Sequence, residues 1–137
     1  MEPKDLVSFY FERTNAMQVL WSFGLTVILG LLAFFGSIKP SPRTTRVAAI
    51  LSLTFVGLAY VNLTGLLSVT RQRIAAAELI RSSHSDTSPG QAAITAIAQT
   101  LDPPTTVGVI SLHIFADIFT LAAVWTLALR KDNDEGA

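Results

Sequence analysis

The stretch VGVISLHIFADIFTLAAVWTLAL, residues 107–129, decides the fold of this chain. It contains 23 residues and a single charged side chain, Asp117. A helix needs about 20 mostly apolar residues to cross the hydrocarbon core of a bilayer. The stretch therefore predicts a membrane-spanning helix with one acid near its middle.

Two further stretches upstream have the same length and carry no charge at all. They are residues 16–38 and 47–69, each 23 residues long. Lipid offers the backbone no hydrogen-bond partners, so a lone spanning segment has to be helical. The sequence predicts an all-α integral membrane protein, one domain in which three transmembrane helices form a small bundle.

The overall composition supports a membrane and excludes several other classes. Half of the 137 residues are apolar and 15% are charged, against about 25% charge in an average soluble domain. The formal net charge is zero, so nothing predicts a nucleic-acid partner. The chain has no cysteine, which excludes disulfides, thiol nucleophiles and Cys-based metal sites.

The segments outside the spans are shorter and more polar. Residues 1–15 combine charges with an aromatic cluster and predict an interfacial helix, either separate or continuous with the first span. Residues 70–106 form the extramembrane loop, whose start is rich in helix formers and whose 89–101 part predicts a short amphipathic helix. Residues 130–137 are a charged tail.

Basic residues in short loops set the orientation of a membrane protein. Five basic residues fall on each side: Lys39, Arg43, Arg46, Arg130 and Lys131 on one, and Lys4, Arg13, Arg71, Arg73 and Arg81 on the other. The long 70–106 loop counts for less, because charge in long loops has a weaker effect. We expect a multi-pass protein of the cell membrane with its N-terminus outside.

Polar residues inside the spans are the candidate functional residues. His113 precedes Asp117 by four residues and so lies on the same helix face. Consecutive spans run in opposite directions, and counting from the common end places Asn62 at nearly the depth of His113. The same count brings Tyr60 and Thr26 near the depth of Asp117. These five residues are the predicted intramembrane polar cluster.

The cluster has two interpretations. Polar side chains in spans commonly hold helices together, whereas an intramembrane acid can also handle protons or ions. The imidazole of His113 could be charged by Asp117 or could accept the proton of a neutral acid. The sequence leaves both interpretations open.

Enzymatic and cofactor chemistry have little support. The chain contains no GxSxG, HExxH or glycine-rich phosphate loop. A membrane haem commonly uses two histidines, yet only His113 lies in a span and His84 lies in the polar loop. We expect no catalytic residues, cofactor or metal.

Two functions remain. The first is a non-enzymatic accessory or scaffold subunit that binds other membrane subunits or copies of itself within the lipid bilayer. Small residues at four-residue spacing would provide its contact faces; these pairs are Thr26 and Gly30, Ala33 and Ser37, and Ala48 and Ser52. The alternative is a homo-oligomeric channel lined by His113, Asp117 and Asn62.

Overall fold

The described part of the chain consists of three α-helices and no strands. The computed structural model describes residues 3–39, 41, 43–82, 96 and 100–134. The helices are α1 (Pro3–Ser37), α2 (Thr44–Ser82) and α4 (Thr106–Asp134). Each is long and apolar enough to cross a membrane. This confirms the predicted all-α chain with three candidate spans.

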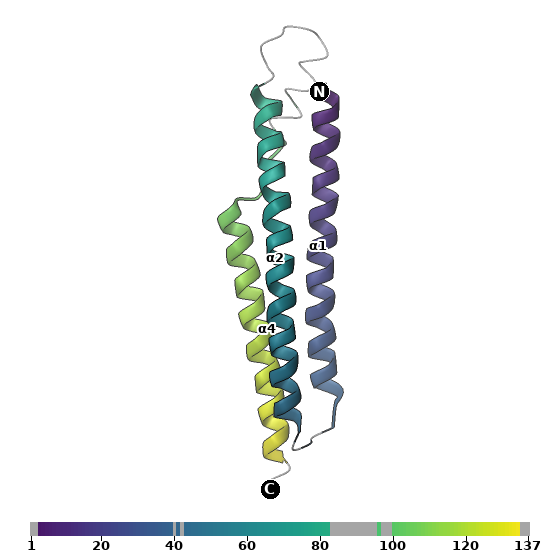
Figure 1. Ribbon diagram of the computed structural model, residues 1–137, viewed down its shortest axis with the longest axis vertical. Helices are drawn as coiled ribbons and strands as arrows, with labels where there is room; N and C mark the ends of the chain where they lie inside the picture. The colour runs from purple at the N-terminus through teal and green to yellow at the C-terminus, as the bar shows by residue number, and fades with distance from the viewer. Residues whose placement is uncertain (1–2, 40, 42, 83–95, 97–99, 135–137) are drawn as a thin grey trace.

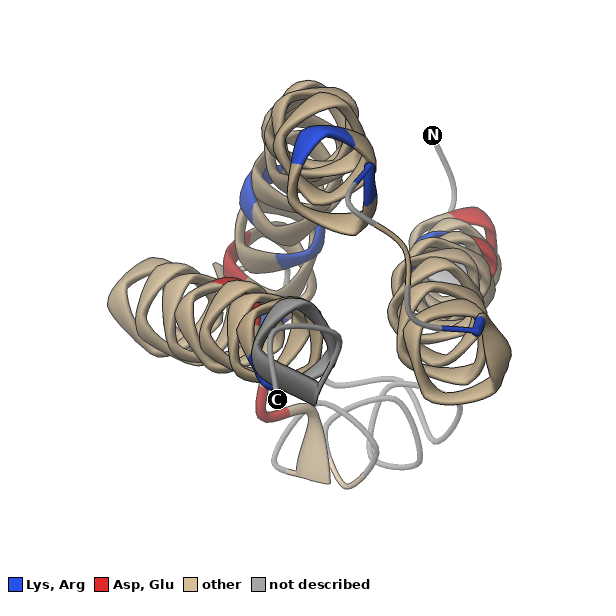
Figure 2. Cartoon of the chain, turned by 90° about the horizontal axis from the view of Figure 1, so that it is seen from below, with Lys and Arg blue, Asp and Glu red and all other residues tan. Residues whose placement is uncertain are grey.

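The three helices form an elongated bundle in which neighbours along the chain run antiparallel (Figure 1). Seen from one end, they stand in a triangle (Figure 2). Helix α2 packs against both other helices, while α1 and α4 contact each other less. Helix α2 is therefore the centre of the bundle.

Helices α1 and α2 are much longer than the roughly 20 residues that a bilayer requires. Helix α1 has 35 residues and α2 has 39, which correspond to about 53 and 59 Å at the helical rise. The hydrocarbon core is only about 30 Å thick. Both helices extend beyond the start of α4 at the N-terminal end of the molecule (Figure 1).

The N-terminal segment is not a separate element. It forms the first turns of α1, and its Leu6 and Tyr10 pack on the last turns of α2 in a cluster with Ala76, Ala77, Ile80 and Leu101. Of the two sequence-based possibilities for residues 1–15, the described part from Pro3 onward is continuous with the span. Its position at a membrane surface stays a prediction.

Arg73 of α2 links this helix to α1 next to this cluster. It is buried, and its Nη2 donates to the Tyr10 hydroxyl at 2.9 Å while Nη1 lies 3.1 Å from the Met17 sulfur. The guanidinium also stacks over the Tyr10 ring, 4.9 Å from its centroid. A weakly hydrated arginine suits such a position at the end of a span.

The outward surface of the spans is apolar. Large side chains such as Leu29, Leu53 and Phe119 stand mostly uncovered. Hydroxyls on this surface donate to carbonyls of their own helix, as Thr54 does to Ile50 and Thr126 to Ala122. An apolar surface of this extent would aggregate in water, so the three helices indicate a membrane-embedded protein.

Some predicted features lie outside the described residues. Most of the predicted 89–101 helix does, as do His84 and the end of the charged tail.

Candidate functional site

The polar residues of α4 meet because of their helical spacing. His113 and Asp117 are four residues apart, and Nδ1 of His113 lies 2.7 Å from Oδ2 of Asp117. The imidazole is almost fully buried, whereas the Asp117 side chain keeps 22% of its surface exposed. A hydrogen bond to a charged group contributes about 1.5–3 kcal/mol, which is similar to the roughly 2.5–3.5 kcal/mol that an acid costs in mid-membrane.

Helix α2 contributes the third member of this group. Asn62 is only 6% exposed, and its Nδ2 lies 3.3 Å from Nε2 of His113. An amide nitrogen can only donate, so Nε2 accepts and the imidazole carries its proton on Nδ1. That proton is then donated to Asp117. We call Asn62, His113 and Asp117 the polar triad.

Helix α1 covers the polar triad with Trp21 and Gly24. The ring centroid of Trp21 lies 6.0 Å from that of His113. A Cβ atom added to Gly24 would lie 3.0 Å from Nδ2 of Asn62, so the absence of a side chain there allows α1 to approach. The sequence analysis did not predict that Trp21 lies beside His113.

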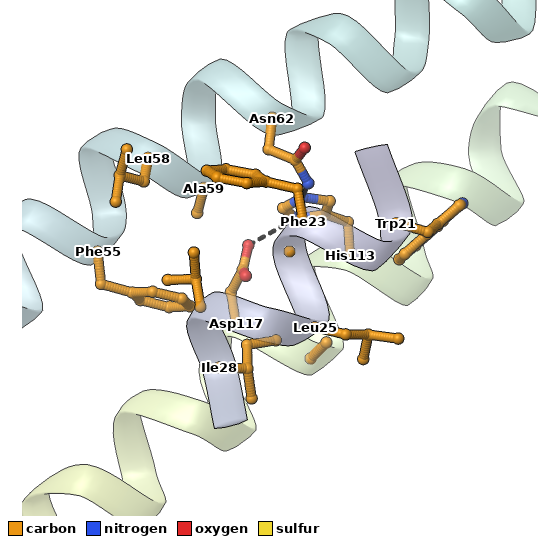
Figure 3. Close-up of a pocket in the computed structure, with 13 residues that line it drawn as sticks. Trp21, Phe23, Leu25, Ile28, Phe55, Leu58, Ala59, Asn62, His113 and Asp117 are labelled. Carbon is orange, nitrogen blue, oxygen red and sulfur yellow. Dashed lines mark hydrogen bonds and ion pairs between the residues drawn. The ribbon is translucent and has the colours of Figure 1, made fainter. Parts of the chain in front are cut away.

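A small pocket lies where the three helices meet the polar triad (Figure 3). Its volume is about 40 Å³, far below the roughly 300–1,000 Å³ of ordinary ligand sites. Its walls are mostly apolar, and Oδ1 of Asn62 is buried without a hydrogen-bond partner among the described residues. The pocket has room for about three water molecules at most, not for a substrate.

Apolar clusters close the bundle on both sides of the polar triad. Toward the N-terminal end lie Met17, Leu66, Val69 and Val109. Toward the other end lie Phe35, Ala48, Val124 and Ala128. The polar triad thus lies between two apolar clusters. The buried hydroxyls of Thr70 and Thr120, on either side of it, donate to carbonyls of their own helices.

The other two predicted cluster residues lie elsewhere. Tyr60 projects outward from α2 and is 69% exposed. Thr26 lies on the exposed side of α1 and donates to the carbonyl of Ser22, 2.8 Å away. The structure thus brings together three of the five predicted residues and leaves Tyr60 and Thr26 outside the buried layer.

The side chains of the polar triad can form hydrogen bonds and can carry a proton. Among the described residues, no group of three or more His, Cys, Asp or Glu side chains could hold a metal ion.

Fold and site together define the class as a helical membrane protein with three candidate spans, two of which are joined by an internal polar triad. Comparison with known proteins places it in no particular family: no protein-family model matches the chain, and neither does a curated protein or a solved structure.

Proposed function

We propose that this chain is a non-enzymatic accessory or scaffold subunit of a membrane assembly, held in the cell membrane with its N-terminus outside. One observation carries the proposal: the polar triad joins α2 to α4 and is closed off on both sides by apolar clusters. Polar groups arranged in this way link helices. A conduit would need polar groups along its length.

An uncovered face of α1 supports a role in protein contacts. Thr26, Gly30, Ala33 and Ser37 recur at three- and four-residue spacing, and all four are exposed. No other atom lies within 4 Å of a Cβ added to Gly30. Small residues let a neighbouring helix come close, so this face suits a helix from a larger partner.

A homo-oligomeric channel is the alternative, and one observation favours it. Asp117 remains partly exposed and also lines a groove on the outside of α2 and α4. In a ring of several copies, such an acid could face a shared pathway.

Purification of the tagged protein in mild detergent tests the proposal. We expect a defined set of larger membrane partners, and we expect Gly30→Leu to reduce their recovery about tenfold, because a clash of about 1.4 kcal/mol has that effect on binding. Gly57→Leu is the matched control, since a Cβ there also meets open space. A chain that purifies alone and gives liposome conductance sensitive to Asp117→Asn would favour the channel instead.

A further inference from the structure

Tyr60 carries a polar hydroxyl on the outward surface of the spans, where its side chain is 69% exposed. It lies nine residues from Val69, about 14 Å from the end of the uncharged stretch, which is farther than a tyrosine side chain can reach. Its hydroxyl has no hydrogen-bond partner among the described residues. A hydroxyl without a partner costs about 4–8 kcal/mol in a solvent that cannot hydrogen-bond.

The Tyr60 hydroxyl cannot bond to its own helix as the threonine hydroxyls near it do. Thr54 and Thr64 on α2 donate to carbonyls of their own helix, at 3.1 and 2.7 Å. The Tyr60 hydroxyl sits at the far end of a rigid ring and is held away from its own backbone. Its acceptor therefore has to come from outside the helix.

An acceptor lies in the same groove as Tyr60. We call this feature the outer groove; its volume is about 200 Å³, and it is lined by Phe55, Val56, Ala59, Tyr60, Leu63 and Asp117. His113 bonds only to Oδ2 of Asp117, and Oδ1 has no partner among the described residues. The outer groove thus carries a donor without an acceptor, the Tyr60 hydroxyl, and an acceptor without a donor, Oδ1 of Asp117.

The two groups also lie at similar depth. Helices α2 and α4 are antiparallel and Asn62 is level with His113, so Tyr60 is two residues, or about 3 Å, from the level of Asp117. Side chains lean toward the N-terminus of their own helix. In antiparallel helices this lean brings Tyr60 and Asp117 closer in depth.

We infer that the outer groove is a homodimer interface in which the Tyr60 hydroxyl of each copy donates to the Asp117 carboxylate of the other. A two-fold axis along the membrane normal keeps every atom at its depth, so donor and acceptor meet twice in one symmetric contact. A second copy satisfies both groups, because the same face supplies both. The inference rests on one premise of the proposed function, namely that uncovered helix faces serve protein contacts.

Dilution of the purified, fluorescently labelled protein in liposomes tests the dimer. We expect a dimer that dissociates as lipid is added, with a dissociation constant raised about tenfold by Tyr60→Phe, since two hydrogen bonds of about 0.6–0.7 kcal/mol are lost. Thr54→Val is the control, because its hydroxyl is already satisfied by Ile50. A monomer at all dilutions, or equal effects of the two variants, would overturn the inference.

Disulfide formation locates the interface independently of Tyr60 chemistry. The chain has no cysteine, so each single substitution introduces its only thiol, and any cross-link forms at that position. Val56→Cys and Leu63→Cys flank Tyr60 in the outer groove and should cross-link on oxidation, whereas Leu29→Cys on α1 should not. Preferential cross-linking at Leu29→Cys would contradict the inference, while the search for larger partners would be unaffected by either result.

Discussion

Replacement of His113 by alanine is expected to lower the free energy of unfolding in a bilayer by about 2–3 kcal/mol. The change removes the donor at 2.7 Å from Asp117 and the acceptor at 3.3 Å from Asn62. The Asn62 amide then remains buried without this partner and the partly exposed Asp117 loses its donor, which is more costly than the loss of the two hydrogen bonds alone. Reversible unfolding in bicelles or by steric trapping measures the effect.

Replacing all three residues of the polar triad should lower the free energy of unfolding much less than replacing His113 alone. In the triple variant Asn62→Leu, His113→Leu and Asp117→Leu no polar group is left without a partner, so we expect stability within about 1 kcal/mol of the natural sequence. Thr126→Ala, which removes an exposed hydroxyl bonded to its own helix, sets the background. If His113→Ala matches that background, the polar triad does not hold the helices together.

The second large effect is expected at Gly24. A Cβ atom there would lie 3.0 Å from the Asn62 amide nitrogen, and valine adds two methyl groups beyond it. The variant must displace either the amide or α1, and overpacking of this kind costs about 1–3 kcal/mol. We therefore expect Gly24→Val to destabilise the bundle and to weaken the contact between Asn62 and His113.

Gly30→Val is the matched control for this prediction. It makes the same change on the same helix, yet no other atom lies within 4 Å of the added Cβ. We expect it to change stability by no more than about 0.5 kcal/mol. Unfolding measurements and the ¹⁵N signals of the His113 ring should separate the two variants, and equal behaviour would place α1 farther from the polar triad than the structure does.

The sequence predicted well which residues of neighbouring spans lie at the same depth, because depth along a span follows from a constant rise per residue. The count that placed Asn62 opposite His113 used this rise and the ends of the uncharged stretches, and the two side chains lie 3.3 Å apart. The pair of His113 and Asp117 follows in the same way from helical spacing. These relations hold for any packing of antiparallel spans.

Rotation about the helix axes could not be predicted so directly. Tyr60 and Asn62 are two residues apart and point about 200° away from each other, so they cannot both face the interior of the bundle. Which of them turns inward depends on the packing of whole helices, for example of Phe35 against Ala48 and Val124. Among the glycines of α1, only Gly24 has an atom of another helix within 4 Å of an added Cβ, which the sequence did not distinguish.

The reaction of single cysteines with a membrane-impermeant maleimide in sealed vesicles tests most directly whether hydrocarbon surrounds the helices. Leu53 is 77% exposed and lies six residues inside the second span, about 9 Å from its start, so Leu53→Cys would react quickly in water. We expect it to stay unlabelled. Ser41→Cys should react from one side of the membrane, and Ser82→Cys from the other. Labelling of Leu53→Cys as fast as of Ser82→Cys would contradict the account.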